Sequence, residues 1–338
     1  MTDVGRVAGV SHQTVSRVLN GSSRVDPTTR ARVLSAIEQL GYRRNVAARA
    51  LVTGRTQTLG VVGFDITLFG PASVLAGIER AARAAGYFVS IANVPRLDRD
   101  SVGDAVDRLK AHAVDGIILI APQSDAVDTL HERAGELPMV VVDGSVGTGL
   151  RRVAVDQAEG ARLATQHLLD LGHSTVWHVS GPGEWHEAVT RQEGWRATLQ
   201  AAGRETPPPV AGDWSTRSGY DAGRLLARVP ELSAVFVAND HMALGLSHAF
   251  YERGRRVPAE VSVVGFDDIP EAEFLTPPLT TVRQNFAALG QAAIQELLAQ
   301  IKGHPAGGDG PIDNGPIDNR LCVRPELVVR GSTACPPA

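Results

Sequence analysis

A short stretch near the N-terminus, SHQTVSRVLNG (11–21), combines side chains that could read nucleic acid. Gln can pair with adenine through two hydrogen bonds, Arg can pair with guanine in the same way, and hydroxyl groups can bond phosphate oxygens. Three apolar residues of the stretch have helical spacing: Val15, Val18 and Leu19. If these pack inward, the opposite helix face carries His12, Gln13, Ser16 and Arg17. The stretch therefore indicates a DNA-reading helix, against the alternative of an ordinary solvated helix face.

Charge is unevenly distributed along the 338 residues. Residues 1–58 contain nine Arg and three acidic residues, a net charge of +6, whereas the whole chain carries −4 and its remainder therefore −10. A small basic segment attached to an acidic body indicates a polyanionic partner for that segment alone. The alternative is a chance clustering of Arg on a solvated surface.

Three short helices are expected to position these side chains. The first ends at Gly9, and Ser11 provides an N-cap for the second. The third begins at Asp26, an N-cap that a first-turn proline follows. Its expected buried residues are Val33, Ile37 and Leu40. Three short helices with a glycine-containing turn between the first two fit a helix-turn-helix unit over residues 1–44. Residues 45–58 are rich in Ala and Arg with little apolar face, which indicates a linker of marginal helix propensity.

At Leu59 the pattern changes to apolar runs that alternate with amphipathic helices. Strands are expected at 59–64, 87–94, 116–122, 139–144, 174–181, 234–240 and 261–268. Continuous β-branched runs separated by helices predict parallel sheets covered on both faces. Seven or more strands in two groups predict an α/β core of two doubly wound lobes. The tandem GPIDN repeat at 310–319 is interpreted as a surface-loop insertion without chemistry of its own.

Polar side chains follow several of these expected strands. Asp143 ends one strand, and the pairs at 239–240 and 267–268 end two others. Because doubly wound sheets bind ligands at their carboxyl edge, these groups could bond the hydroxyls of a small polar ligand such as a sugar. Trp214 could supply an aromatic plane for the C–H face of the sugar. Taken singly, each residue has an equally good structural role, as a helix cap or in core packing.

The N-terminal sequence DVGRVAGVSHQTVSRVLNGSSRVDPTTRARVLSAIEQLGY, with ARAL and GRT after it, closely resembles the DNA-binding head of the lac repressor (LacI/GalR) family. The resemblance continues through GIILIAP, HLLDLGH, AGDWSTRSGY, VANDHMALG, SVVGFDDIPEAEFLTPPLTTVRQNF and ELVVRGST, so it covers almost the whole chain. It implies a helix-turn-helix head, a hinge and a two-lobed core like that of periplasmic sugar-binding proteins. The implied segments are a head at 1–44, a hinge helix or linker at 45–58, and an effector-binding and dimerisation core at 59–338. The implied lobes of the core are a first lobe of about 59–155 and 284–320 and a second of about 156–283 and 321–332.

The resemblance also implies which residues touch DNA. Base contacts are implied for His12, Gln13 and Arg17. Phosphate contacts are implied for Thr14, Ser16 and Asn20. Contacts from the hinge are implied for Asn45 and Leu51. Leu51 aligns with the leucine that enters the minor groove at the operator centre and kinks the DNA, so the hinge helix need form only on DNA. Gly5 replaces an alanine common in the first helix, which could loosen the head slightly.

An effector pocket between the lobes is the second implication of the resemblance. The implied effector-binding residues are Leu68, Asp143, Arg191, Trp214, Asn239, Asp267, Gln284 and Phe286. Arg191 aligns with an arginine that bonds sugar hydroxyls in many members. Leu68 belongs to the LFGP loop at the pocket mouth, and Gln284 and Phe286 lie at an expected crossover between the lobes.

Matches within SHQTVSR, GDWS and LFGP and at Trp195 indicate, within the family, a member that responds to a galactoside. Three differences argue against a galactoside. Glu187 and Val155 stand where such a member has Ser and Phe, and Phe69-Gly70 alters the pocket mouth.

We therefore expect a sequence-specific transcriptional repressor that binds palindromic operator DNA as a homodimer and is controlled by a small sugar-like effector. The effector could instead be a corepressor, which strengthens DNA binding. A sugar-binding protein without regulatory DNA binding is one alternative, but it predicts an export signal and no basic head. An enzyme with the same α/β core is another, but the sequence has no GxGxxG after the first strand, no P-loop, no HExxH and no GxSxG.

Composition limits the cellular setting. No run of about 18 apolar residues is present, and the N-terminus lacks the features of a signal peptide, so neither a membrane partner nor export is expected. The two cysteines, Cys322 and Cys335, form neither a disulfide framework nor a metal-ligand spacing, which suits the cytoplasm. We expect no cofactor and no metal. The chain ends without a leucine heptad, which favours a dimer over a tetramer.

Overall fold

The computed structural model describes residues 1–19, 21–42, 54–96, 98–120, 133, 135–143, 151–303 and 320–337. The chain divides into two compact units, Met1–Thr56 and Gln57–Ala338. Within the described ranges, no helix is long and apolar enough to cross a membrane.

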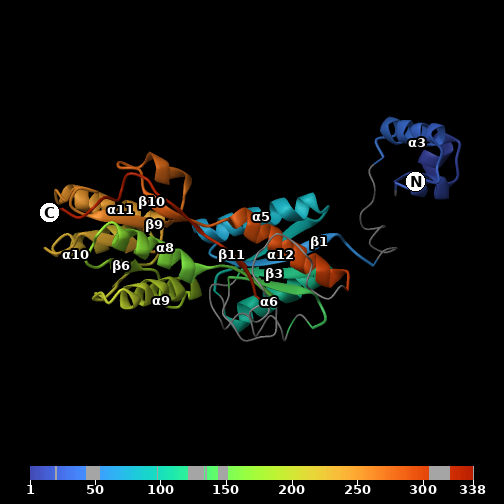
Figure 1. The fold of residues 1–338 in the computed structure, drawn as a ribbon. Coiled ribbons are helices and arrows are strands. Elements are labelled where there is room, and N and C mark those ends of the chain that lie inside the picture. Colours follow the sequence, from blue (N-terminus) through green and yellow to red (C-terminus); the bar gives the residue numbers. More distant parts are fainter. Residues whose placement is uncertain are drawn as a thin grey trace. The chain divides into compact units, whose positions relative to one another are not determined.

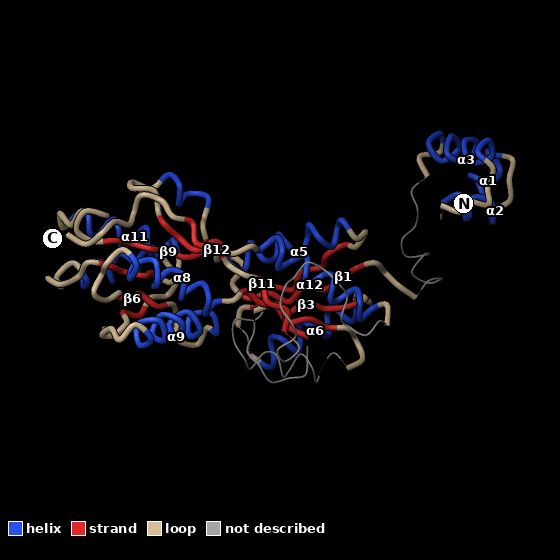
Figure 2. The backbone as a smooth tube through the Cα atoms, viewed as in Figure 1, coloured by secondary structure: helices blue, strands red, loops and turns tan. Residues whose placement is uncertain are grey.

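The first unit packs three short helices around a small core (Figure 2). The helices are α1 (Thr2–Ala8), α2 (His12–Leu19) and α3 (Pro27–Gln39). As the sequence predicts, Asp26 caps α3 by accepting a hydrogen bond from the backbone N–H of Thr29 (2.9 Å), and Pro27 occupies the first turn. The fully buried core residues are Val4, Ala8, Val15, Val18, Val33 and Ala36. Leu40, which the sequence predicts to be buried, is 42% exposed because it is the C-cap residue beyond the last helical residue.

Gly5 lies where α1 approaches the turn that follows it. The residue is buried, and a Cβ atom at this position would lie 2.8 Å from the carbonyl oxygen of Val10. The absence of a side chain therefore permits a close approach of two backbone segments, which offsets the conformational cost of glycine inside a helix.

The second unit contains two six-stranded sheets with helices on both faces (Figure 1). In the first sheet the strand order is β11-β5-β4-β3-β1-β2, and every pair is parallel. The strands are β1 (Thr58–Phe64), β2 (Phe88–Val94), β3 (Gly116–Ile120), β4 (Met139–Val142), β5 (Arg151–Val155) and β11 (Arg320–Val323). Two helices, α5 (Phe69–Ala84) and α12 (Phe286–Ile301), pack on one face, and α6 (Arg99–Ala111) packs on the other.

The second sheet has the order β12-β10-β9-β8-β6-β7, in which only the β10–β12 pair is antiparallel. Its strands are β6 (Trp177–Ser180), β7 (Val210–Ala211), β8 (Ala234–Val237), β9 (Ser262–Asp267), β10 (Thr280–Arg283) and β12 (Glu326–Val328). Its helices are α8 (Gln157–Asp170) and α9 (His186–Ala201) on one face and α10 (Thr216–Leu226) and α11 (Asp240–Glu252) on the other, with a 3-10 turn η1 (Pro270–Phe274). These observations confirm the expected α/β core of two doubly wound lobes.

The chain passes between the two sheets three times: after β5, after β10 and after β11. The first two crossings fall where the expected lobe boundaries at 155/156 and 283/284 place them. The third differs from the expected boundary at 320/321. Because β11 pairs with β5, residues 321–323 belong to the first sheet, and the crossing falls at 324–325.

Helices α5 and α12 touch through two glycines. A Cβ atom on Gly77 would lie 2.4 Å from the carbonyl oxygen of Phe286. A Cβ atom on Gly290 would lie 2.3 Å from the carbonyl carbon of Gly77. The first lobe therefore depends on glycine at both positions, because the two backbones are in direct contact there.

Replacing Gly290 by alanine should destabilise the core by about 1–3 kcal/mol, the usual cost of overpacking. The gain from removing a helical glycine, about 0.5–1 kcal/mol, is smaller and does not compensate. Urea unfolding followed by circular dichroism measures the change. Gly183→Ala is the matched control, because a Cβ atom at Gly183 would meet no atom within 4 Å. A Gly290→Ala protein as stable as the wild type would contradict the account of this helix contact.

Candidate functional site

Helix α2 is anchored on one side and at its start. Val15 and Val18 are buried, and Leu19 packs partly buried against the same core. The Oγ atom of Ser11 accepts a hydrogen bond from the backbone N–H of Thr14 (3.2 Å), so the expected N-cap is present. The helix axis and its first turn are therefore fixed by the rest of the head.

The opposite face of α2 is polar. His12, Gln13 and Arg17 are exposed, and Thr14 and Ser16 are half-buried. A short helix with one packed face and one polar face of these types has the geometry of a recognition helix that enters a major groove. The remaining predicted DNA-contacting residues lie outside the described part of the chain: Asn20, Asn45 and Leu51.

The two lobes of the second unit enclose a cavity of about 270 Å³. All eight predicted effector residues line it: Leu68, Asp143, Arg191, Trp214, Asn239, Asp267, Gln284 and Phe286. Most of them follow strands, at the ends of β4, β7, β8, β9 and β10. The cavity thus lies at the carboxyl edges of parallel strands, the position at which doubly wound sheets bind ligands.

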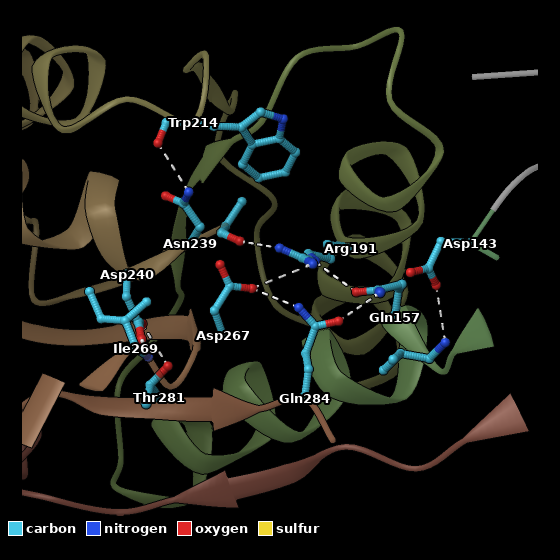
Figure 3. Close-up of polar contacts among 12 residues, drawn as sticks. Asp143, Gln157, Arg191, Trp214, Asn239, Asp240, Asp267, Ile269, Thr281 and Gln284 are labelled. Atoms are coloured by element: carbon cyan, nitrogen blue, oxygen red, sulfur yellow. Dashed lines mark hydrogen bonds and ion pairs between the residues drawn. The ribbon is translucent and has the colours of Figure 1, made fainter. Parts of the chain in front are cut away.

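Four side chains on the cavity wall form a ring of polar contacts (Figure 3). Arg191 donates from Nε to Oε1 of Gln157 (2.8 Å), and Gln157 donates from Nε2 to Oε1 of Gln284 (3.0 Å). Gln284 donates in turn from Nε2 to Oδ1 of Asp267 (2.6 Å). A guanidinium nitrogen of Arg191 lies 3.8 Å from the same Oδ1 and closes the ring. Each member is therefore oriented by two others.

Arg191 is the central group of this ring. The residue is 4% exposed and also donates to the carbonyl oxygen of Ala238 at the end of β8. Its guanidinium carbon lies 3.8 Å from the ring centroid of Phe266 and 5.5 Å from that of Trp214. Burial lowers the pKa of Arg191, and the carboxylate of Asp267 opposes this shift. The structure therefore presents a buried, oriented cation beside an aromatic plane.

Two acidic residues of the cavity have raised pKa values. Burial raises the pKa of Asp267 to about 6, against the opposing effects of Arg191 and Gln284. Burial, together with the nearby charge of Asp143, raises the pKa of Glu187 to about 8. The cavity thus holds carboxyl groups that can accept or donate hydrogen bonds near neutral pH.

Asn239 and Asp240 both make hydrogen bonds that fix neighbouring segments of the second lobe. The Asn239 side chain caps α11 by accepting from the N–H of Met242 (2.9 Å) and donates from Nδ2 to the carbonyl oxygen of Trp214 (3.0 Å). It therefore positions Trp214, whose φ of 72° places the backbone in the left-handed region. Asp240 is fully buried and accepts from the Thr281 hydroxyl (2.6 Å), so it does not belong to the cavity wall.

Aromatic side chains also line the cavity. Trp185 meets Trp214 edge to face, with ring centroids 5.7 Å apart and an interplanar angle of 70°. Phe69 meets Phe286 edge to face at 5.9 Å, and it lies 6.3 Å from the ring of His241. A ligand in the cavity would therefore meet a polar ring of contacts on one side and aromatic rings on the other.

Gln157, Trp185 and His241 line the cavity but are absent from the predicted effector-binding set. Glu187 is absent from that set too, although the sequence singles it out as a difference from galactoside-responsive members. Gln157 begins α8 directly after the crossing from β5, so recognising that strand would have identified it. Trp185 and Glu187 stand at the start of α9, after the SGPG turn that follows β6. Among the described residues, no group of three or more His, Cys, Asp or Glu side chains could hold a metal ion.

Comparisons with known proteins agree with this geometry. Residues 1–45 match the family model of bacterial regulatory proteins, lacI family, and residues 165–333 match that of the periplasmic binding protein-like domain. The chain is 35% identical over 314 residues to the lactose operon repressor of Escherichia coli (strain K12), which covers 91% of this chain and 86% of that protein. The chain belongs to the lacI family. The resemblance read from the sequence and the α/β fold class are thereby confirmed.

Other members of the lacI family extend the comparison. The ribose operon repressor of Escherichia coli (strain K12) is also 35% identical, over 89% of this chain and 92% of that protein. A crystal structure of the lac repressor dimer bound to operator and the anti-inducer ONPF superposes with a TM-score of 0.85 at 32% identity, covering 98% of both chains. Both relatives are transcriptional repressors, which confirms the expectation of a regulator rather than an enzyme.

The raised pKa of Asp267 predicts a pH dependence of stability. Because the folded value of about 6 lies above the unfolded value of 3.8, the contribution of Asp267 to the free energy of unfolding falls as pH rises between these values. Above about pH 7 it is constant. Asp267→Asn removes this contribution, so its stability relative to the wild type should rise by about 1–3 kcal/mol across the window.

Urea unfolding at a series of pH values measures this difference. Asp221→Asn, at an exposed position of α10, serves as the control and should not reproduce the change. A constant difference between Asp267→Asn and the wild type from about pH 4 to 8 would show that Asp267 titrates normally.

Proposed function

We propose that the chain is a sequence-specific DNA-binding transcriptional repressor whose affinity for operator DNA is controlled by a small sugar-like effector. One observation carries the proposal: the same chain has a packed helix that exposes Gln13 and Arg17 and a separate cleft lined by the polar ring around Arg191. A head alone would suit an unregulated DNA-binding protein, and a cleft alone would suit a solute-binding protein. Both together support a regulator.

On the DNA side, we assign base-edge contacts to His12, Gln13 and Arg17. Phosphate contacts are assigned to Thr14, Ser16 and Asn20, and hinge contacts to Asn45 and Leu51. Two copies related by a two-fold axis would present two α2 helices to a palindromic operator, because the symmetry of the dimer matches that of the half-sites. The relative solved on operator DNA is itself a dimer.

We assign the dimer contact to apolar side chains that the core leaves uncovered. On the edge strand β2, Phe88 is 69% and Ile91 is 50% exposed. On the second lobe, Tyr251 at the end of α11 and Phe274 of η1 are about equally uncovered, at 80% and 77%. An edge strand with large exposed apolar residues is prone to aggregation unless another chain covers it. A second copy of this chain is the partner that the proposed palindrome requires.

The effector proposed for the cleft is a sugar. Hydroxyl groups both donate and accept hydrogen bonds, which suits a wall of carboxylates, amides and a guanidinium. The C–H face of a pyranose is apolar and suits Trp214, which is oriented by Asn239. Arg191 is already held in place by Gln157 and Ala238, so little entropy would be lost when it bonds a ligand.

A galactoside is the finer proposal for the effector. It is supported by the match to the lactose operon repressor and by the GDWS segment that carries Trp214. Two observations widen the range of candidate effectors. Trp185 and Glu187 also line the wall, near Trp214 and Asp143. The ribose operon repressor is as similar to this chain, at 35% identity, as the lactose operon repressor. A panel of candidate effectors must therefore contain pentoses and disaccharides as well as galactosides.

The proposed coupling is a shift between two states of the core. An effector that binds the closed cleft more tightly shifts the population toward that state, and DNA affinity changes by the same coupling free energy. Release of DNA on effector binding is the proposed direction. A corepressor would have the opposite sign.

A gel shift with palindromic DNA from the promoter region upstream of its own gene tests the proposal. The protein should bind a palindrome more tightly than a single half-site, and one sugar of the panel should change the affinity. Binding to no palindrome would overturn the repressor assignment. Stronger binding in the presence of the sugar would identify a corepressor.

Substitutions in α2 should have unequal effects on DNA binding. Gln13→Ala or Arg17→Ala should change which bases are preferred, at about 1–3 kcal/mol each, because these side chains reach base edges. Ser16→Ala should weaken all operator sequences alike, because a phosphate contact carries no sequence information. Binding to a library of randomised half-sites measures both effects. A uniform loss for Gln13→Ala would remove it from the base-reading set.

Substitutions in the cleft should weaken the effector response strongly. Arg191→Ala leaves Asp267 without its cation, and Trp214→Ala removes the stacking plane, so each should reduce the effector-induced rise in melting temperature by more than half, equivalent to a loss of about 2 kcal/mol of binding. Thermal shifts across the sugar panel measure this. Arg217→Ala, at an exposed position of α10, is the control. An unchanged shift in Arg191→Ala would show that the effector binds elsewhere.

A further inference from the structure

Two acidic side chains line the cavity from different lobes. Asp143 follows β4 of the first sheet, and Glu187 lies in the first turn of α9, which packs on the second sheet. Closing the cleft therefore brings a carboxyl group of one lobe toward a carboxyl group of the other. Like charges in a poorly solvated cavity repel more strongly than in water.

The two carboxyl groups differ in their partners. Asp143 accepts a hydrogen bond at Oδ1 from the backbone N–H of Val155 (3.2 Å), which holds it in the first lobe. Glu187 is 8% exposed, and its Oε2 atom has no hydrogen-bond partner among the described residues. A buried ionised oxygen without a partner is costly, whereas a protonated carboxyl or one that accepts a hydrogen bond from a ligand is not.

A second buried polar atom of the cavity wall also lacks a hydrogen-bond partner among the described residues. The indole N–H of Trp214, a residue 7% exposed, also has no hydrogen-bond acceptor within the described part of the chain. The wall therefore offers one unsatisfied donor and one unsatisfied carboxyl oxygen. A hydroxylated ligand could satisfy both kinds of group, because a hydroxyl both donates and accepts.

Charged groups around Glu187 come from both lobes. Asp143 opposes its ionisation, while Arg191 on the same helix and Arg152 on β5 favour it. Arg152 donates to the backbone carbonyl of Asp143 (3.3 Å), so it belongs to the first lobe as well. Among the described residues, the other titratable groups that line the cavity are His241 on α11 and Asp267 on β9. Burial and Asp143 outweigh the two arginines, since the pKa of Glu187 is raised to about 8.

We propose that Glu187 and Asp143 form a carboxyl pair across the cleft that opposes closure of the empty cleft when both side chains are ionised. A ligand group that donates a hydrogen bond to the pair removes this opposition, and so does a proton on Glu187. Glu187 is then the residue that selects for an effector with a donor at this position. The inference rests on the proposed effector site, but its test needs neither effector nor DNA.

The sign of the pH dependence follows from the two states of Glu187. In the structure, where the cavity buries Glu187, its pKa is raised to about 8, and a cleft opened far enough to solvate the side chain would return the pKa toward its ordinary value of 4.5. Closure therefore takes up a proton between these values, and the closed state loses stability as pH rises through this range. One proton per closure changes the closed-to-open ratio by at most about tenfold for each pH unit. Asp267, with a pKa of about 6, contributes little above about pH 7.

Aromatic contacts between the lobes provide a reporter of closure. Phe64 in β1 lies 6.0 Å from Trp185, measured between ring centroids, and Phe69 lies 6.3 Å from His241. Trp185 is 9% exposed in the structure, and a movement that separates the lobes would part these ring pairs and expose it to solvent. Tryptophan emission should therefore shift to longer wavelength on opening.

The full-length protein without effector is measured by small-angle X-ray scattering and tryptophan emission from about pH 6 to about pH 8.5. The wild type should expand and its emission should shift as pH rises to about 8, the upper end of the window set by the pKa of Glu187, and both should change little above it. Glu187→Gln should remain compact, because the amide carries no charge. Asp143→Asn, which removes the other charge, should reduce the change and provides a second variant. Glu184→Gln, at an exposed position three residues earlier, should behave like the wild type.

A wild-type protein with no change in this pH range would overturn the proposal, and so would a Glu187→Gln protein that keeps the wild-type change. Light scattering at each pH separates cleft opening from dissociation of a dimer. Loss of DNA binding in the gel shift would overturn the proposed function and leave this result standing. The two failures are therefore distinguishable.

Discussion

The buried guanidinium of Arg191 is the group on which the arrangement of the cleft depends. A cation at this depth is stable only with several fixed acceptors, because desolvation is costly and a single missing partner would leave the charge uncompensated. Its partners come from separate elements: Gln157 starts α8, Ala238 directly follows β8, and Asp267, the ion-pair partner, ends β9. Three elements of the second lobe are thereby held at fixed positions around one side chain.

The same contacts reach the points where the chain passes between lobes. Gln157 directly follows the first crossing, and Gln284 directly follows β10 at the second. The two side chains are hydrogen-bonded to each other (3.0 Å). A ligand that bonds Arg191 or Asp267 would therefore act on residues adjacent to the connections between the two lobes. This placement gives a physical route from binding to domain motion, as hinge closure requires. The carboxyl pair of Glu187 and Asp143 acts against the same motion from the two opposing walls.

In the N-terminal head, the packing of one helix face determines which side chains are exposed on the other. Two buried valines, Val15 and Val18, and the cap at Ser11 fix α2, and the polar residues of the helix are exposed as a consequence. Buried apolar residues and exposed polar residues alternate along one helix, so the core of the head sets the orientation of His12, Gln13 and Arg17, the residues proposed to contact bases. Regulation is possible because this unit and the core belong to one chain, although each has its own hydrophobic core.

Much of this organisation is determined by the sequence. Helical spacing and caps identify the three helices of the head, and long β-branched runs identify the central strands of both sheets, because local patterns carry that information. Strand ends also place Asp143 at the carboxyl edge of the first sheet, and Asn239 and Asp267 at that of the second. Short strands without a strong pattern, such as β5 and β11, form because they pair with neighbouring strands of the sheet. The position of the third crossing therefore depends on the pairing of β11 with β5 rather than on local sequence. The tertiary structure alone decides that Gln157 bonds Arg191, that Asn239 positions Trp214, and that Glu187 and a carboxyl group of the other lobe line the same cavity. These contacts join residues that are far apart in the chain, and no local sequence pattern encodes their proximity.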